Sequence, residues 1–203
     1  MSMYNSNGYF TFEVALIQEK MKSNNYVQQL LEDLKERVVV KSLTKGEEIL
    51  SVGQVCDYVG IVRNGSLRMY YIDSEGNDVS FGFYLSGDIF TNYEGVLTDF
   101  PSQMIIVTMD DATVELIRKE DLLSYYDSSL EHQKLGRRMA ELIFLQAKKR
   151  IDFLLFLTPE QRYLQLIETS PEVFDCIPQK HIASYIGVKP QSLSRIRKRL
   201  QEK

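Results

Sequence analysis

The longest uninterrupted helical pattern in the sequence lies at residues 129–157, which contain no proline and a single glycine, Gly136. Apolar residues recur here at steps of three and four, the spacing that places side chains on one face of an α-helix. The members of this stripe are Leu135, Met139, Leu142, Ile143, Ala147, Ile151 and Leu154. About 28 residues form a rod of roughly 42 Å, too long for a small barrel to cover. We therefore expect the stripe to pair with a second copy of the chain as a dimerisation helix; the alternative is ordinary core.

Residues 38–117 have a different texture. Short segments rich in Val, Ile, Tyr and Phe alternate with turn signals such as Asn64-Gly65 and Gly76-Asn77, whose residues tolerate the positive φ of tight hairpins. Residues 66–72 and 78–84 alternate in polarity as strands with one buried face do. Turn signals recur roughly every ten residues, the rhythm of an antiparallel sandwich or barrel. We expect an antiparallel β-roll that, with the helices around it, makes an α+β protein.

The sequence divides into four parts. Residues 1–25 form an N-terminal extension to which we assign no function, with a short helical pattern at residues 12–22. Residues 26–128 comprise the β-roll domain, which begins with a short helix predicted at residues 26–36. Residues 129–157 form the long helix. Residues 158–203 form the C-terminal part, in which Thr158 and Gln161 predict a capping box and Pro159 the first helical residue.

Residues 178–200 follow the pattern of a helix-turn-helix. Pro178 opens the first helix, Ala183 supplies the small side chain needed where two helices cross steeply, and Gly187 can take the left-handed conformation that ends a helix. Pro190 begins the second helix. The expected inner stripes are Ile182, Ala183 and Ile186, then Leu193, Ile196 and Leu200. The alternative to a DNA-binding unit is a purely structural helical hairpin.

The outer face of the second helix carries donors suited to base edges and phosphates. They are Gln191, Ser192, Arg195, Lys198 and Arg199. Lys189 occupies the position where Ser, Thr or Asp would normally cap the helix, which suggests a phosphate contact or, equally simply, surface variation. Residues 180–203 hold seven Lys or Arg and one Glu, net +6, whereas the other 179 residues hold 17 basic and 27 acidic residues, net −10. A basic end on an acidic body favours contact between that end and a polyanion, here double-stranded DNA.

These parts together resemble the cyclic-AMP receptor and fumarate–nitrate regulator (Crp/Fnr) family of bacterial transcription factors. The resemblance rests on residues 43–50, 60–69 and 84–90 in the roll and on residues 182–188 and 193–197 in the helix pair, and it extends over about residues 30–200. It implies a cyclic-nucleotide-binding-like jelly roll, a homodimer and a near-palindromic DNA site, with RNA polymerase as a further partner. By position it places Gln191 and Arg195 at bases and Lys189, Ser192 and Ser194 near the DNA backbone.

The effector site departs from the family. Cyclic-nucleotide binders there use a glutamate for the ribose hydroxyl and an arginine for the phosphate, but residues 91–93 read Thr-Asn-Tyr and residues 101–103 read Pro-Ser-Gln. A buried phosphate without a cation is strongly disfavoured, so we do not expect cyclic AMP. A different small ligand or no effector at all both stay open. The candidate pocket is Phe90, Thr91, Asn92, Tyr93, Ser102 and Gln103.

Other classes of protein find little support. The two cysteines, Cys56 and Cys176, and the two histidines, His132 and His181, are scattered, so we expect no metal, iron–sulfur cluster or haem. We find no catalytic motif, export signal or membrane span, and expect a cytoplasmic protein that is not an enzyme. The family's β-hairpin wing does not follow the second helix before Lys203, so we expect weak or strongly salt-dependent DNA binding. The alternative function is a ligand sensor that acts through protein contacts and has lost DNA recognition.

Overall fold

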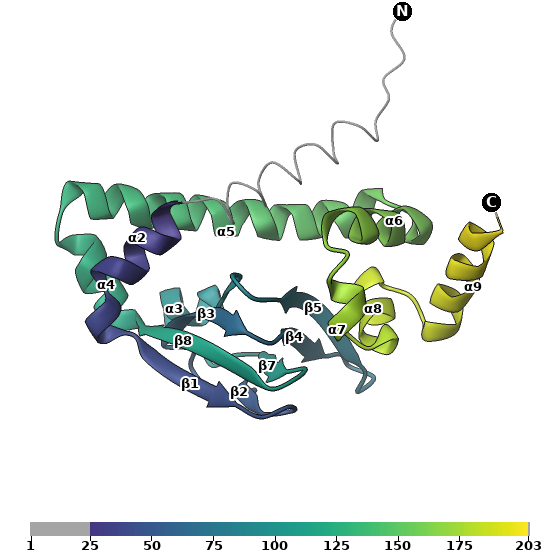
Figure 1. Ribbon diagram of the computed structural model, residues 1–203, viewed down its shortest axis with the longest axis horizontal. Coiled ribbons are helices and arrows are strands. Elements are labelled where there is room, and N and C mark those ends of the chain that lie inside the picture. The colour runs from purple at the N-terminus through teal and green to yellow at the C-terminus, as the bar shows by residue number, and fades with distance from the viewer. Residues whose placement is uncertain (1–24, 203) are drawn as a thin grey trace, which may run out of the picture.

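The computed structural model describes residues 25–202. A β-roll forms the body of the molecule, and α5 (Leu130–Phe156) runs along one side of it (Figure 1). Helices α2 (Asn25–Asp33) and α4 (Lys119–Asp127) lie at one end of α5, and residues 159–201 form a cluster of helices at the other (Figure 1). The helical pattern at residues 12–22 lies outside the described residues. None of the described helices is long and apolar enough to cross a bilayer.

The roll consists of two antiparallel sheets of four strands each. One sheet has the order β1 (Val39–Leu43), β8 (Ala112–Arg118), β3 (Tyr58–Asn64) and β6 (Ile89–Phe90). The other has the order β2 (Glu48–Leu50), β7 (Met104–Thr108), β4 (Leu67–Ile72) and β5 (Asp78–Tyr84). The predicted strands at residues 66–72 and 78–84 are β4 and β5, and the turn glycines Gly65 and Gly76 have φ of +84° and +82°. The expectation of an antiparallel roll in an α+β protein is confirmed.

Apolar side chains from both sheets fill the space between them. The largest fully buried ones are Leu50, Val62, Leu67, Met69, Phe90, Ile106 and Val114. Phe90 packs so closely on Gly60 of β3 that a Cβ at Gly60 would lie 2.2 Å from the phenyl ring. The short strand β6 is therefore held against β3 by a contact that only glycine permits.

The helices after the roll begin at the caps that local sequence provides. The Ser129 side chain accepts a hydrogen bond from the His132 N–H at the start of α5. Thr158 and Gln161 form the predicted capping box at the start of α6 (Pro159–Thr169). The helix predicted at residues 26–36 is α2 followed by a 3₁₀-helix at Lys35–Arg37. Two shorter helices, α3 (Tyr93–Thr98) and α7 (Val173–Cys176), were not expected, since they are too short to show a helical period.

The predicted helix pair is α8 (Gln179–Ile186) and α9 (Pro190–Gln201). Gly187 ends α8 with φ +78°, and the Val188 N–H donates to the Ala183 carbonyl in the turn. Ala183 is fully buried where the helices meet. The inner stripes pack with α6 and α7 into one apolar core that contains Tyr163, Leu166, Val173, Ile177, Ile182, Ile186, Leu193 and Ile196. Of the residues predicted for the two inner stripes, Leu200 alone is partly buried, and the others are buried.

Candidate functional site

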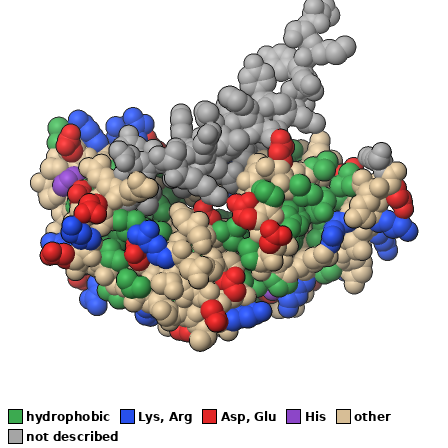
Figure 2. Space-filling view, viewed as in Figure 1, with side chains coloured by type: hydrophobic (Ala, Val, Ile, Leu, Met, Phe, Trp, Pro, Cys, Tyr) green, Lys and Arg blue, Asp and Glu red, His purple; other side chains and the backbone are tan. Residues whose placement is uncertain are grey.

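The outer face of α9 is open to solvent. Gln191, Ser194, Arg195, Lys198 and Arg199 are exposed, whereas Ser192 is half-buried. Figure 2 shows basic side chains at the end of the molecule where α9 lies. Within residues 25–202, Arg195 forms no ion pair. Its guanidinium is therefore free to bond an external acceptor.

Three further basic residues of α9 have defined surroundings. Lys189 is the exposed N-cap residue, and its side chain makes no capping hydrogen bond. The positive end of the α9 dipole is thus left without a side-chain acceptor, an arrangement that suits a phosphate. Arg199 pairs with Glu160 on α6, and the Lys198 ammonium lies 3.9 Å from a Glu202 carboxylate oxygen. A DNA phosphate would compete with both acids, which are on the surface where such pairs are weak.

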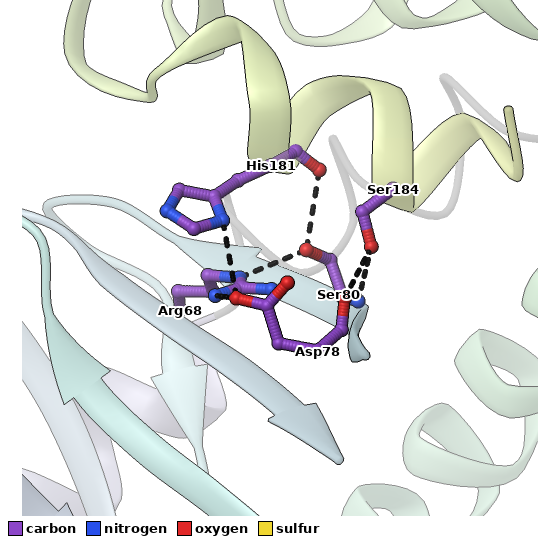
Figure 3. Close-up of polar contacts among 5 residues, drawn as sticks. All are labelled: Arg68, Asp78, Ser80, His181 and Ser184. Atoms are coloured by element: carbon purple, nitrogen blue, oxygen red, sulfur yellow. Dashed lines mark hydrogen bonds and ion pairs between the residues drawn. The ribbon is translucent and has the colours of Figure 1, made fainter. Parts of the chain in front are cut away.

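A set of hydrogen bonds docks α8 onto strand β5 (Figure 3). Ser80 is fully buried. Its N–H donates to the Ser184 hydroxyl at 2.9 Å, and its own hydroxyl donates to the His181 carbonyl at 3.1 Å. The Ser184 hydroxyl in turn donates to the Asp78 carbonyl at 3.0 Å. Ser80 thus bonds α8 through both its backbone and its side chain.

Strand β5 is irregular at the position where α8 docks. Met69 pairs with Gly82 and Tyr70 pairs with Ser80, so that Phe81 is the extra residue of a β-bulge. A bulge interrupts the ladder and twists the strand locally. Strand β5 also lies at the edge of its sheet, so the N–H groups on its outer side have no strand partner, and the Ser80 N–H bonds the Ser184 hydroxyl.

Charged side chains surround this contact. Arg68 is buried, and it donates from Nε to the Ser80 hydroxyl and from Nη1 to an Asp78 carboxylate oxygen, each at 2.8 Å. His181 Nδ1 lies 3.7 Å from the same Asp78 oxygen. Burial first, and then the nearby Arg68 guanidinium, lower the pKa of His181 to about 4 although Asp78 acts in the opposite direction. His181 is therefore neutral at pH 7, and Arg68 carries the positive charge that pairs with Asp78.

Two arginines fasten the C-terminal half of α8. Arg150 of α5 donates from Nη2 to the Ser80 carbonyl at 3.1 Å and to the Tyr185 carbonyl at 2.8 Å, and its guanidinium lies 3.9 Å from the centre of the Tyr185 ring. Arg162 of α6 donates to the carbonyls of Leu157 and Ile186. Carbonyls at a helix C-terminus carry partial negative charge, so cations placed there stabilise it. Helix α8 is therefore held by β5, α5 and α6 together.

The predicted dimer stripe of α5 does not lie on a single accessible face. Leu135 and Met139 are 5% and 6% exposed and are buried within this chain. Leu142, Ile143 and Ala147 line a cavity beside the roll, while Ile151 and Leu154 are exposed. The opposite face of α5 presents large apolar side chains that the sequence prediction did not include. They are Leu130, Phe144, Leu155 and Phe156, which are 68%, 67%, 71% and 73% exposed.

The predicted pocket residues are partly bonded to one another. Asn92 and Ser102 are both buried, and the Asn92 amide donates to the Ser102 hydroxyl at 2.8 Å. The Ser102 hydroxyl also bonds the backbone of Met104, donating to its carbonyl and accepting from its N–H. Phe90 belongs to the core of the roll, and Gln103 is exposed. These contacts fix the loop before β7 and leave little of Ser102 for a ligand.

A cavity of about 530 Å³ lies between the roll, α5, α6 and α7. Thr91, Asn92 and Tyr93 line it, whereas Phe90, Ser102 and Gln103 are not among its lining residues. Most of its wall is apolar, including Met69, Phe81, Met104, Met139, Leu142 and Ile143. Its volume lies within the range of roughly 300–1,000 Å³ typical of small-molecule sites. The cavity thus overlaps half of the predicted pocket and extends from it along α5.

Sequence reasoning missed the residues that join these parts. Ser80 and Ser184 are 104 positions apart, and nothing in the local pattern of either predicts their contact. Arg150 offered a weak signal, since it is a cation on the face of the long helix that also carries Phe153, a buried residue. A charged residue on a buried helix face requires a hydrogen-bond partner. In the structure, the carbonyls of Ser80 and Tyr185 are the partners of Arg150.

Comparison with known proteins agrees with this architecture. The family model described as "Cyclic nucleotide-binding domain" matches residues 40–129, which run from β1 to just beyond α4. The transcriptional regulatory protein btr of Bordetella pertussis is 29% identical over 185 residues, which cover 85% of this chain and 74% of btr. A regulator assigned to the Crp/Fnr family from Eubacterium rectale has a similar structure, with a TM-score of 0.64 and 16% identity over 90% of this chain and 86% of that one. These likenesses show that the chain has the fold of Crp/Fnr-type regulators.

Two other solved structures share the fold over most of their length. FixK2 from Bradyrhizobium japonicum has a TM-score of 0.68 and 20% identity over 81% of this chain and 85% of that one. A CooA mutant from Carboxydothermus hydrogenoformans has a TM-score of 0.66 and 14% identity over 89% and 86% of the two chains. The shared part of this chain therefore extends past the roll into α5 and the C-terminal helices.

Proposed function

We propose that this chain is a sequence-specific DNA-binding regulator of transcription of the Crp/Fnr type, that it acts as a homodimer in the cytoplasm, and that it is not an enzyme. The observation that carries the proposal is the exposed outer face of α9. Gln191 and Arg195 can form paired hydrogen bonds with adenine and guanine in the major groove. We assign Lys189, Ser192 and Ser194 to phosphate contacts, which position a protein on DNA without reading its sequence. The curated relative btr is itself named a transcriptional regulatory protein.

Dimerisation follows from the exposed apolar face of α5. Phe144, Ile151 and Leu155 succeed one another at steps of seven and four residues, so they lie on one side of the helix, away from the roll. A contiguous apolar face of this kind is typical of a protein–protein contact. Pairing of α5 with α5 of a second chain would give a dimer with two α9 helices, as a near-palindromic DNA site requires.

The dimer can be tested with two matched substitutions. Phe144→Glu puts a charge into the proposed helix–helix contact, whereas Phe100→Glu makes the same change at a roll residue that is 65% exposed. We expect light scattering after size-exclusion chromatography to give a dimer for the unmodified chain and for Phe100→Glu, and a monomer for Phe144→Glu. A dimer that persists in Phe144→Glu, or a monomeric unmodified chain, contradicts this part of the proposal.

The role of α9 can be tested by the salt dependence of binding to any DNA duplex. Each phosphate contact that is lost lowers the slope of log K against log [salt] by about one. Lys189→Ala should therefore reduce the slope, while Arg137→Ala, an exposed arginine of α5 that pairs with Glu141, should leave it unchanged. Equal slopes for the unmodified chain and Lys189→Ala would show that the N-terminus of α9 does not contact phosphate.

We propose that the effector is not cyclic AMP, because Asn92 and Ser102, which stand where the family places its nucleotide contacts, bond one another. Neither side chain carries the positive charge that a buried phosphate needs. The apolar wall of the cavity favours a ligand of different chemistry.

A further inference from the structure

The last turn of α9 is joined to the first turn of α6 by an ion pair. The Arg199 guanidinium pairs with the Glu160 carboxylate, and among residues 25–202 no other side chain of α9 forms an ion pair with a different helix or strand. The Glu160 side chain is 26% exposed and lies in the first turn of α6, where the positive end of the helix dipole favours a carboxylate. Glu160 is therefore a well-placed acceptor, and it draws Arg199 toward α6.

The same turn of α6 also holds the other helix of the pair. Arg162 donates to the Ile186 carbonyl at the end of α8, just before the turn that leads into α9. The capping box of Thr158 and Gln161 fixes the geometry of this part of α6. The start of α9 is thus attached to α6 through Arg162, and the last turn of α9 is attached through the ion pair. Two separate points of attachment fix the direction of a helix, whereas a single one leaves it free to pivot.

The apolar packing of α9 decreases toward its C-terminus. Leu193 and Ile196 are 2% and 7% exposed, whereas Leu200 is only partly buried. The ion pair is made from this last turn, where the apolar contacts are fewest. A polar contact has its largest effect on orientation at such a point. Arg199 is therefore placed to set the position of the C-terminal half of α9.

The acid on α6 also bears on how α9 meets DNA. A DNA phosphate takes Arg199 only by separating it from Glu160. The phosphate would then lie close to a carboxylate that has lost this cation, and a contact between like charges opposes binding. With the ion pair intact, the charge of Glu160 is compensated while DNA is bound. The balance of charges therefore favours retention of the pair in the complex.

We propose that Arg199 is a positioning residue that stays paired with Glu160 on DNA and contacts no phosphate. The pair holds the C-terminal half of α9 against α6 at the angle that brings Gln191 and Arg195 to the base edges. This role differs from the one that the sequence predicts, in which Arg199 donates to DNA. Its part in DNA recognition rests on the proposed function, whereas its effect on α9 itself does not.

The effect of Glu160→Gln on DNA binding distinguishes the two roles. The probes are a near-palindromic duplex enriched from genomic DNA by the full-length chain and a scrambled duplex of the same composition, compared by fluorescence anisotropy. We expect Glu160→Gln to lower the ratio of the two affinities by about three-fold, the size expected for an ion pair near the surface. Glu168→Gln, at an exposed acid of the same helix, should leave the ratio unchanged. Release of Arg199 to DNA would instead tighten the binding of both duplexes, so an unchanged or higher ratio in Glu160→Gln overturns the proposal.

The salt dependence of binding tests for a phosphate contact. Loss of one such contact lowers the slope of log K against log [salt] by about one. Arg199→Gln should lower the affinity ratio as Glu160→Gln does, but keep the slope of the unmodified chain on the scrambled duplex. Arg137→Gln, at an arginine of α5 that pairs with Glu141, should change neither quantity. A slope that falls by about one in Arg199→Gln overturns the proposal.

Hydrogen exchange without DNA tests the contact itself. Backbone amides of residues 196–201 should exchange several-fold faster in Glu160→Gln and in Arg199→Gln than in the unmodified chain. The reversed pair, Glu160→Arg with Arg199→Glu, should slow their exchange again, because either order of the two charges permits the ion pair. Unchanged exchange in both single variants, or no recovery in the reversed pair, overturns the proposal.

These measurements separate the inference from the proposed function. If neither duplex is preferred by the unmodified chain, the proposed function fails, and the exchange rates decide whether the ion pair holds α9. If the enriched duplex is preferred but the slope falls in Arg199→Gln, the inference fails and the proposed function stands.

Discussion

Replacement of Ser184 by alanine removes the helix side of the contact that docks α8 onto the roll. The Ser184 hydroxyl accepts from the Ser80 N–H at 2.9 Å and donates to the Asp78 carbonyl at 3.0 Å. The two losses are unequal. Ser80 is fully buried, so its N–H keeps no partner, which costs about 1–3 kcal/mol. The Asp78 carbonyl bond is exposed to water, and its loss costs about 0.5 kcal/mol.

Together these losses predict that Ser184→Ala lowers the free energy of unfolding by about 2 kcal/mol. For a chain of this length, that corresponds to a fall in Tm of roughly 4–8 °C. The substitution also improves helix propensity slightly. Ser194→Ala, at an exposed position of α9, makes the same improvement without breaking a contact, so it should stay within about 0.5 kcal/mol of the unmodified chain.

Urea denaturation followed by far-ultraviolet circular dichroism measures both variants at one protein concentration, because dimerisation would otherwise shift the apparent stability. Native-state hydrogen exchange of residues 78–84 and 179–186 then locates the change. Indistinguishable stability of Ser184→Ala and Ser194→Ala would refute the reasoning, since it would mean that the buried Ser80 N–H finds another acceptor. An equal loss of protection throughout the roll would show that the effect is not confined to the docking of α8.

Two further predictions concern the same region. The folded pKa of His181 is about 4, below its ordinary value of 6.5, so the unfolded chain binds more protons between these values. The free energy of unfolding should therefore fall by roughly 1–2 kcal/mol, after allowance for solvent screening, as the pH drops from about 6.5 to about 4. Denaturation at several pH values should show this fall for the unmodified chain and for His132→Gln. His181→Gln should reduce the dependence of stability on pH over this range. Gly187→Ala should cost more than Gly76→Ala in thermal unfolding. Both glycines have positive φ, but at Gly187 a Cβ would lie 2.8 Å from Nη1 of Arg162 and would displace it from its hydrogen bond to the Ile186 carbonyl, whereas at Gly76 it would meet nothing within 4 Å. Equal costs would contradict this argument.

The elements that short-range signals determine could be predicted from the sequence. The capping box at Thr158 and Gln161 and the left-handed Gly187 depend on residues within one turn of a helix, and both are found as expected. The hairpin from β4 to β5 follows from a turn that requires Gly76. In each case the residues that determine the local structure lie within a few positions of one another in the sequence.

The features that the sequence did not predict depend on contacts between distant elements, such as which face of α5 packs on the roll. Both faces of α5 carry large apolar residues, so periodicity alone could not distinguish the buried Met139 from the exposed Phe144. The docking of α8 depends on a bond between Ser80 and Ser184, which are 104 residues apart. The cavity is a space between elements and not a property of any segment, which explains why Arg150 was absent from the predicted site.

Selection of genomic DNA fragments by the purified full-length chain, followed by sequencing, tests the central claim most directly. The account predicts enrichment of a near-palindromic sequence with half-sites whose centres lie about 10 base pairs apart. Arg195→Ala should weaken binding to that sequence by about 1–3 kcal/mol and relax the preference at one position of each half-site. Arg137→Ala should bind like the unmodified chain. Absence of any enriched sequence, or an enriched sequence that Arg195→Ala binds with full affinity and unchanged preference, would contradict the claim that α9 reads DNA.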